Sequence, residues 1–298
     1  MHGFINIYKQ SGMTSFDVIR RLKRIFPGTR MGHTGTLDPM ATGVLPIALG
    51  QATKIIEYLE NDDKIYQTSM VLGAVSDTQD AWGKIEYTGA KNIATEQIWR
   101  VLQKFTGTIE QIPPMYSAVH YNGQRLYDLA RRGIEVERPP RLVHIRRLDL
   151  LKQTVNEDGL PEVHLEVECS KGTYIRTLCY DIGQELGTGA YMSALLRVRS
   201  GQFTLNTAHT LDEILDQGNP EEFLLPVDYP LHHFQRFDVQ DARDRTRIKN
   251  GNRIAVTESR PGELIRIYDQ DCLLAIARQV AVDGKQFIQP VKVFGNKN

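Results

Sequence analysis

The feature that most constrains the fold is the strict alternation of apolar and polar side chains over residues 163–169. The odd positions are Val, Leu, Val and Cys, and the even positions are His, Glu and Glu. This alternation predicts a β-strand with one buried and one solvated face, as found in antiparallel sheets. After Gly172 the period changes to that of a helix, which we expect to run to Leu186.

Other strand-like and helix-like segments follow one another without the regular strand–helix–strand rhythm of a doubly wound fold. The strand-like segments are residues 4–7, 65–72 and 85–87, and the helix-like segments are residues 14–26, 53–59 and 95–105. This mixture predicts an α+β fold with a mixed, largely antiparallel sheet flanked by helices and loops.

A domain boundary is indicated by acidic residues, glycine and prolines that cluster over residues 211–229. The chain has 298 residues, enough for one large domain or two of unequal size. Beyond the boundary, three short strand-like runs lie at residues 263–268, 272–280 and 287–294. They predict a small C-terminal all-β barrel.

Cysteine usage and hydropathy indicate where the protein works. The three cysteines lie far apart, without the paired short spacing of a zinc site or of a small disulfide framework, and they fit a reducing cytosol. The N-terminus lacks the pattern of a secretion signal, and no apolar run approaches the length of about 18 residues that spans a membrane. We therefore expect a cytoplasmic protein without membrane association.

The predicted helix at residues 14–26 is amphipathic and basic. It begins with a capping box at Thr14–Asp17 and ends at Pro27. Its apolar residues fall on one face, whereas Arg20, Arg21, Lys23 and Arg24 fall mostly on the other. A solvated helix face is the more common explanation of such a strip, and a surface for a polyanion is the alternative.

Local charge matters because the net charge is zero, with 36 basic and 36 acidic residues. Seven arginines stand against three acids between Arg125 and Arg147, and six basic residues against three acids between Arg236 and Arg253. Tyr116 and Tyr127 lie beside the first group, where their rings could stack on unpaired bases while arginines hold phosphates. Core or hairpin tyrosines are an equally good interpretation of this pattern.

Periodicity stops between Met31 and Pro46, where three glycines and two prolines predict a structured loop. Asp38 lies in this segment between Leu37 and Pro39. A carboxylate held in such a loop could act as a nucleophile or base. A turn-forming aspartate before proline is, however, the more common case.

A second dense segment spans residues 169–177, where the predicted strand passes into the helix. Tyr174 and Arg176 are two residues apart and would share a face in extended backbone, with the guanidinium able to pair with a carboxylate. The alternative is a surface arginine and a half-buried tyrosine. The motifs of triad hydrolases, phosphate-binding loops and zinc enzymes are absent from the sequence, which disfavours those classes.

The segment at residues 32–46, Gly-His-Thr-Gly-Thr-Leu-Asp-Pro-Met-Ala-Thr-Gly-Val-Leu-Pro, closely resembles the catalytic motif of the TruB family of tRNA pseudouridine synthases. Further segments resemble successive blocks of that family, in order, at residues 64–66, 111–118, 126–133 and 170–177. The resemblance covers about the first 230 residues.

The resemblance implies a tRNA pseudouridine synthase, an isomerase that flips uridine 55 out of the T-loop and converts it to pseudouridine. It implies no cofactor and no metal, in agreement with a rearrangement that involves no net redox change. By family analogy Asp38 is the nucleophile, attacking C6 of the base or C1′ of the ribose, and Arg176 pairs with it and keeps it ionised. Tyr66 would stack on the uracil, and Tyr174 belongs to the same constellation.

Further residues match family positions that bind substrate. Leu195 matches an apolar residue that packs against the base, and a dry pocket matters because water would intercept a broken glycosidic bond. His33 matches the residue that fills the space left by the flipped uridine. Tyr116, Tyr127, Arg131 and Arg132 belong to a segment, at about residues 115–147, that resembles a mobile element closing over the T-arm.

The same resemblance implies a catalytic domain at residues 1–230 and a PUA-like RNA-binding domain at residues 231–298, with contact to the acceptor end of tRNA. The absence of a long Lys-rich extension favours a stand-alone enzyme, expected to be a monomer, over a guide-RNA-dependent one that needs a protein partner. A non-catalytic RNA-binding or tRNA-chaperone protein, which would not need Asp38, is the competing hypothesis from another class.

Overall fold

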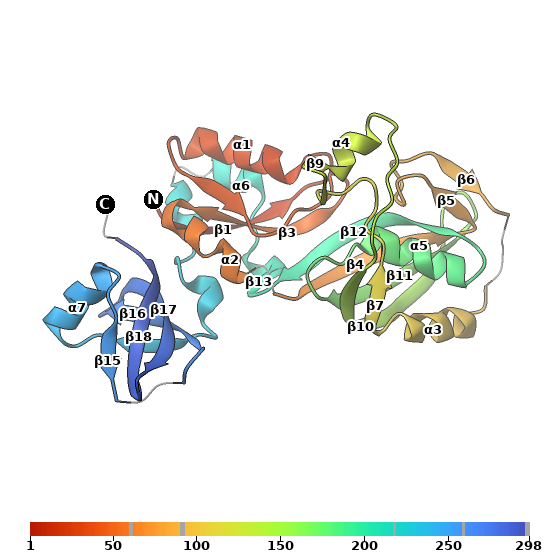
Figure 1. The fold of residues 1–298 in the computed structure, drawn as a ribbon. Helices are drawn as coiled ribbons and strands as arrows, with labels where there is room; N and C mark the ends of the chain where they lie inside the picture. Colours follow the sequence, from red (N-terminus) through yellow and green to blue (C-terminus); the bar gives the residue numbers. More distant parts are fainter. Residues whose placement is uncertain (60–61, 90–92, 217–218, 258–259, 296–298) are drawn as a thin grey trace.

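The computed structural model describes residues 1–59, 62–89, 93–216, 219–257 and 260–295. Its main element is a nine-stranded sheet in the order β1-β3-β12-β4-β11-β10-β7, with β2 paired to β3 and β13 to β12 (Figure 1). The strands are β1 (Gly3–Lys9), β2 (Met31–His33), β3 (Thr42–Leu49), β4 (Lys64–Leu72), β7 (Gly107–Gln111), β10 (Arg141–Val155), β11 (Pro161–Cys169), β12 (Ala190–Ser200) and β13 (Phe203–Thr204). Within this sheet the described pairings are antiparallel except that of β3 with β12. The prediction of an α+β fold with a mixed, largely antiparallel sheet is confirmed.

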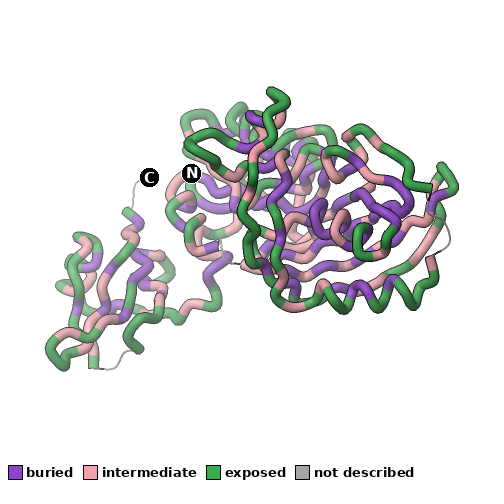
Figure 2. Tube along the Cα trace, turned by 45° about the vertical axis from the view of Figure 1, so that its right-hand side comes forward, coloured by how far each residue is buried: buried purple, intermediate pink, exposed green. Residues whose placement is uncertain are grey.

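Helices flank the sheet in two groups. Near β1 and β3 lie α1 (Ser15–Ile25), α2 (Ile56–Leu59) and α6 (Leu211–Asp216), and near β10 and β12 lie α3 (Thr95–Lys104) and α5 (Ile175–Glu185). Short 3₁₀ helices span Gly50–Lys54, Leu205–Thr207, Pro220–Phe223 and Tyr229–Leu231. The largest apolar cluster lies between the helices and the sheet, so buried residues follow the interior strands (Figure 2).

Helix α1 begins as its sequence predicts. The Thr14 hydroxyl accepts a hydrogen bond from the Asp17 amide, and the Asp17 carboxylate accepts one from the Thr14 amide. Val18 and Leu22 are fully buried on the core side. Two backbone amides at the helix start thus have hydrogen-bond acceptors, and one face of the helix is apolar. Local hydrogen bonds and packing against the core together stabilise the helix.

The loop predicted between Met31 and Pro46 is wrong at both of its ends, where β2 and β3 form. Glycine and proline are loop signals, but β3 pairs with β1 from Gly43 to Leu49. Gly43 allows the close approach of β3 to β12, since it has φ +100° and a Cβ there would lie 2.3 Å from the Arg197 carbonyl oxygen. Tertiary pairing therefore overrides the local signal.

Two long strands, β10 and β12, were not predicted. Each contains two register shifts, in β10 near Arg147 and Leu150 and in β12 near Met192 and Arg197. An extra residue at a bulge moves the alternation of side chains to the opposite face. The alternation of apolar and polar residues is therefore not visible in the sequence, although both strands are long.

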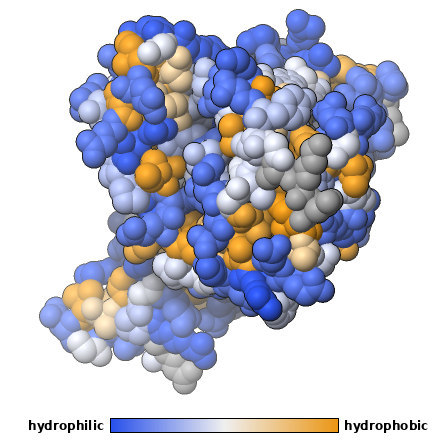
Figure 3. Space-filling model, turned by 90° about the vertical axis from the view of Figure 1, so that its right-hand side faces the viewer, coloured by the Kyte–Doolittle hydropathy of each residue, from blue (hydrophilic) through white to orange (hydrophobic). Residues whose placement is uncertain are grey.

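Two small hairpins project from this core. One consists of β5 (Ala74–Ser76) and β6 (Ile85–Tyr87), and the other of β8 (His120–Tyr121) and β9 (Gln124–Arg125), which leads into α4 (Leu126–Ala130). Seen from the side that bears β5 and β6, the surface is largely hydrophilic with a few hydrophobic patches (Figure 3). No described helix is long and apolar enough to cross a membrane.

The C-terminal residues form a separate curled sheet in the order β14-β16-β17-β18-β15. Its elements are β14 (Gln235–Asp238), α7 (Ala242–Lys249), β15 (Ile254–Val256), β16 (Leu264–Asp269), β17 (Cys272–Val282) and β18 (Lys285–Val293). The three predicted strands correspond to β16, β17 and β18, whereas α7 was not predicted.

The C-terminal sheet packs beside β1 and the start of α2. The Lys54 ammonium donates to the Val293 carbonyl at 2.8 Å, and Lys292 pairs with Glu57 at 2.7 Å. The connecting segment returns to β1, where Phe4 and Leu225 exchange backbone hydrogen bonds. Residues 217–218, inside the segment predicted as a boundary, lie outside the described residues.

Candidate active site

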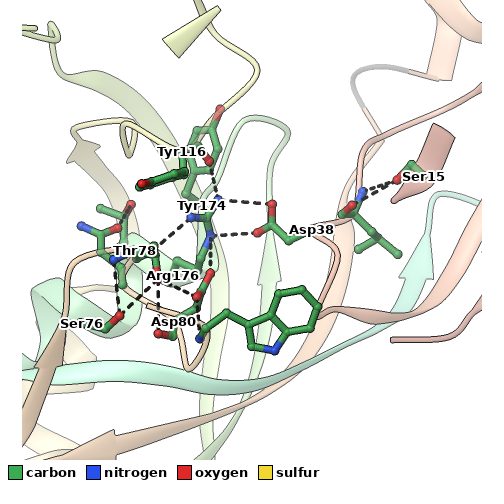
Figure 4. Close-up of polar contacts among 12 residues, drawn as sticks. Ser15, Asp38, Ser76, Thr78, Asp80, Tyr116, Tyr174 and Arg176 are labelled. Atoms are coloured by element: carbon green, nitrogen blue, oxygen red, sulfur yellow. Dashed lines mark hydrogen bonds and ion pairs between the residues drawn. The ribbon is translucent and has the colours of Figure 1, made fainter. Parts of the chain in front are cut away.

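Asp38 and Arg176 point toward one another and form an ion pair (Figure 4). Asp38 lies in the turn between β2 and β3, and Arg176 lies in the first turn of α5. The guanidinium donates from Nε to one carboxylate oxygen at 2.8 Å and from Nη2 to the other at 3.2 Å. Arg176 is 4% exposed and the Asp38 side chain 32%. The pair is thus bidentate, with a buried cation and a carboxylate that solvent or a substrate can reach.

Two further N–H groups of Arg176 donate to backbone carbonyls. Nη1 donates to the Thr78 carbonyl at 3.1 Å, and Nη2 donates to the Tyr116 carbonyl at 2.8 Å. A second carboxylate oxygen, from Asp80, lies 3.7 Å from Nε. Arg176 is therefore held between two acids and two backbone carbonyls, so its position is defined from several directions.

Asp80 was not identified from the sequence. It is buried, and its carboxylate accepts hydrogen bonds from the Thr78 hydroxyl at 2.7 Å and the Trp82 amide at 3.0 Å. The preceding Gln79 has φ +63°, a conformation uncommon for a residue other than glycine. The run of hydroxyl and carboxylate side chains at residues 76–80 was the available signal, but nothing local connects it to Arg176.

The turn that carries Asp38 is held on its flanks by side chains from β1 and α1. The Ser15 hydroxyl both accepts from the Leu37 amide at 2.9 Å and donates to the Leu37 carbonyl at 3.2 Å. The Lys9 ammonium, which is fully buried, donates to the Pro39 carbonyl at 3.1 Å. Burial lowers the pKa of Lys9 to about 8, and the charge of Asp38 acts in the opposite direction.

Arg197 of β12 holds the same turn from the other side. Its guanidinium, 1% exposed, donates to the carbonyls of Val44 at 2.7 Å, Gly35 at 3.0 Å and Thr36 at 3.5 Å. Among the described residues no carboxylate lies within 4.0 Å of it. An arginine buried without an acidic partner is costly. Here the compensation is a set of backbone carbonyls on both sides of Asp38.

We expect Arg197→Met to lower the free energy of unfolding by about 2 to 4 kcal/mol, because buried carbonyls left without a donor cost about 1 to 3 kcal/mol each. Urea denaturation would measure the change. Arg199→Met, two residues along the same strand, is the matched control, since the half-exposed Arg199 pairs with Glu168 and should cost about 1 kcal/mol or less. Equal losses in the two variants would contradict the anchoring role.

The other side chains predicted for the catalytic centre lie around this pair. Tyr66 in β4 is buried, which raises the pKa of its phenol, and the charge of Arg197 opposes this. Leu195 in β12 is buried and lines a cavity of about 480 Å³ together with Met40 and Trp82. Burial also raises the pKa of Tyr174. The charge of Asp38 acts on the pKa of both phenols, which places Tyr66 and Tyr174 near the ion pair.

The expectation that Tyr174 and Arg176 share a face of extended backbone is wrong. Tyr174 is the extended residue before α5, with φ −97° and ψ 109°, and Arg176 is already helical. Gln111 fixes this junction, since its side chain accepts from the Tyr174 amide at 2.8 Å and donates to the Tyr174 carbonyl at 3.1 Å. The two side chains converge because the chain turns into the helix between them.

The predicted substrate-binding residues fall into two groups. His33 is in β2, its Nδ1 atom is buried without a hydrogen-bond partner, and burial lowers its pKa. Tyr116 reaches Arg176 through its carbonyl oxygen. Tyr127, Arg131 and Arg132 lie at α4, which projects from the sheet (Figure 1), and they make no described contact with Asp38.

Within the described residues no group of three or more His, Cys, Asp or Glu side chains could hold a metal ion. The titratable groups of the site are instead the carboxylates of Asp38 and Asp80, the guanidinium of Arg176, and the largely buried phenols of Tyr66 and Tyr174. Such an arrangement can supply a carboxylate nucleophile or base beside a planar ring, with water restricted on the apolar side.

A second cavity, of about 960 Å³, is lined by Thr78, Tyr116 and Asp181 among others. Burial raises the pKa of Asp181 from 3.8 to about 6. The folded protein therefore binds this proton more tightly than the unfolded chain, and stability is lost as pH rises from about 4 to above 6.

We expect Asp181→Asn to raise the melting temperature at pH 7.5 and to change it little at pH 4, because the amide has no charge to bury. Thermal unfolding of both proteins across this pH range would measure the effect. Asp216→Asn, at an exposed carboxylate, is the control and should show no pH-dependent difference. A wild-type advantage at pH 7.5 would contradict the assignment.

Two family models match consecutive parts of the chain. The N-terminal domain of the TruB family pseudouridylate synthase matches residues 23–175, and the tRNA pseudouridylate synthase B C-terminal domain matches residues 176–232. Together they cover more than half of the chain.

Curated relatives align over nearly the full length. The chain is 48% identical to tRNA pseudouridine synthase B of Syntrophomonas wolfei over 297 residues, which is 99% of each chain. It is 45% identical to the protein of that name from Heliobacterium mobile (98% of this chain, 95% of the relative) and 42% identical to that from Clostridium tetani (94% and 96%).

Solved structures share the fold. A chain of an H/ACA RNP bound to a substrate RNA containing 2′-deoxyuridine superposes with a TM-score of 0.74 at 25% identity. A chain of a Cbf5-Nop10-Gar1 complex gives a TM-score of 0.74 at 27% identity. Each comparison covers 98% of this chain and 85% of the other.

Proposed function

The chain belongs to the TruB family of tRNA pseudouridine synthases, the isomerases that make pseudouridine 55, and we propose that Asp38 is its catalytic nucleophile. The observation that carries this proposal is the bidentate ion pair between Asp38 and the buried Arg176. That pair aims a carboxylate at the solvent-accessible side of the site, and hydrogen bonds on both flanks of the turn limit its motion.

The reaction needs a nucleophile but no net oxidant or reductant. The N1–C1′ bond of uridine breaks, the uracil turns, the C5–C1′ bond forms, and a proton leaves C5 while N1 gains one. Asp38 can assist by attacking C6 of the base or C1′ of the ribose, and both routes begin from the same ionised carboxylate. No cofactor or metal enters either route.

The walls of the site suit a uracil ring. We assign Tyr66 to stacking on the base, Leu195 to apolar contact, and Tyr174 to the same wall, since Tyr66 and Leu195 are buried and the charge of Asp38 acts on the pKa of both phenols. Restricting water there protects a broken glycosidic bond from hydrolysis. Because a base inside the T-loop is stacked, the substrate uridine must flip out, and His33 is assigned to the space that it leaves.

Binding of tRNA is assigned to the insertion at residues 115–147 and to the C-terminal domain. Arg125 and Arg131 lie over the Tyr127 ring at 5.8 and 5.5 Å, and Arg132 follows just after the end of α4. Exposed arginines around an aromatic ring suit an RNA backbone with unpaired bases. We assign the T-arm to this insertion, and the acceptor end to a PUA-like domain at residues 231–298.

We further propose that the enzyme acts alone, as a monomer in the cytoplasm, on tRNA without a guide RNA. Full-length identity of 42–48% to tRNA pseudouridine synthases B supports this over the 25–27% identity to chains of an H/ACA RNP and of a Cbf5-Nop10-Gar1 complex.

Tritium release from an unmodified tRNA transcript labelled at uridine C5 tests the proposal directly. Purified protein without added metal, guide RNA or other protein should release one tritium per tRNA, and a transcript with cytidine at position 55 should release none. A requirement for a second macromolecule would identify a guide-directed enzyme. Tight tRNA binding without release would identify a non-catalytic RNA-binding protein.

A further inference from the structure

Helix α1 carries an exposed basic face that the catalytic centre does not use. Arg20, Arg21, Lys23 and Arg24 are all exposed, while Val18 and Leu22 on the opposite side are buried in the core. Because the apolar side of the helix is already covered, it has no second face with which to enter a membrane. Only the cationic side is available to a partner.

Most of these charges have no ion-pair partner among the described residues. Arg20 pairs with Asp17 at 3.1 Å, but no carboxylate of the described residues lies within 4.0 Å of Arg21, Lys23 or Arg24. Elsewhere on the surface cations are commonly paired, as Lys84 is with Glu86 at 2.8 Å. Like charges three or four residues apart on a helix repel one another, so this cluster lowers the stability of the helix and does not contribute to folding.

The helix is rigidly connected to the catalytic turn. Ser15, in the first turn of α1, makes two hydrogen bonds to Leu37, the residue before Asp38. In Figure 4, Ser15 lies on one side of Asp38, and Tyr116 and Arg176 lie on the other. An 11-residue helix extends for about 16 Å, long enough to follow several phosphates of an RNA strand.

We infer that the exposed face of α1, formed by Arg21, Lys23 and Arg24, is a second phosphate-binding surface for tRNA, flanking Asp38 opposite the insertion at residues 115–147. In Figure 1, α1 and α4 project from the same side of the sheet, so a tRNA arm whose uridine reaches Asp38 passes between two basic walls. This inference rests on tRNA being the substrate. A polyanion fits this surface because its phosphates supply negative charges to the three cations that have no carboxylate nearby.

The test is the salt dependence of tRNA binding by Arg21→Gln/Lys23→Gln/Arg24→Gln. Glutamine keeps the helix propensity, so the fold is retained, and circular dichroism would verify this. If the three side chains contact phosphates, the slope of log affinity against log salt concentration becomes shallower by about 2 to 3 units. Single-turnover conversion at saturating enzyme stays within about twofold, because the Asp38–Arg176 pair is untouched.

The matched control is Lys84→Gln/Lys104→Gln/Arg199→Gln, which removes the same charge from three cations that are paired with glutamates and lie outside the parts assigned to tRNA binding. Its slope should equal that of the wild type. Equal slopes in the α1 variant and the control would overturn the inference. Slower conversion at saturation with an unchanged slope would also overturn it, and would assign α1 to support of the Asp38 turn. Wild-type conversion tests the proposed function separately.

Discussion

Replacing Asp38 with asparagine is expected to abolish pseudouridine formation while leaving tRNA affinity nearly unchanged. The amide has no negative charge with which to attack C6 or C1′, and the loss of an essential group in a catalytic unit lowers turnover by about 10⁴-fold or more. Affinity should persist because phosphate contacts supply most of it. The side chain also stays similar in size, so the packing around the turn is preserved.

Tritium release under single-turnover conditions, together with filter binding of the same tRNA, would measure both quantities. Asp158→Asn, at an exposed carboxylate in the turn between β10 and β11, is the control and should behave as the wild type. Appreciable product from Asp38→Asn would transfer the nucleophile's role to another carboxylate, and Asp80 would be the first to examine because it also approaches Arg176.

Arg176→Lys is expected to lower turnover by about 10²-fold or more with little effect on tRNA affinity, a loss typical of removing a fixed electrostatic donor. Lysine keeps the charge but cannot donate to both oxygens of Asp38 and also to the carbonyls of Thr78 and Tyr116. The carboxylate would keep a cation nearby but lose its fixed direction.

Arg176→Ala should be slower still, but it leaves two carboxylates around an empty buried site, and breaking a buried pair costs about 3 to 5 kcal/mol of stability. The lysine variant is therefore the more informative one. Arg199→Lys, at a half-exposed ion pair in β12, serves as its control. Comparable losses of turnover and affinity in Arg176→Lys would mean that Arg176 binds phosphate and does not orient Asp38.

A site residue could be predicted when the sequence pattern that marks it lies in neighbouring residues. Asp38 and Arg176 lie in dense, recognisable segments, and the structure brings them together as the family resemblance implies. Asp80, Lys9 and Arg197 were missed, because each acts through hydrogen bonds or charges directed at residues distant in the sequence. Arg197 and Val44, for example, are 153 positions apart.

Features that arise from short-range chemistry could be predicted from the sequence alone. These are the capping box and amphipathic face of α1, the alternation in β11, the strands β16 to β18, and the motif around Asp38. Each depends on neighbours within a few residues, so the pattern survives without knowledge of the fold.

The course of the long strands and the support of the catalytic turn depend instead on tertiary contacts. Bulges in β10 and β12 shift the side-chain alternation, and the pairing of β3 with β1 overrides the glycines and prolines of its segment. The buried cations Lys9 and Arg197 acquire their partners only when β1 and β12 approach the Asp38 turn. A charge is stable in a protein interior only where the fold brings acceptors to it, so its role is a property of the assembled structure.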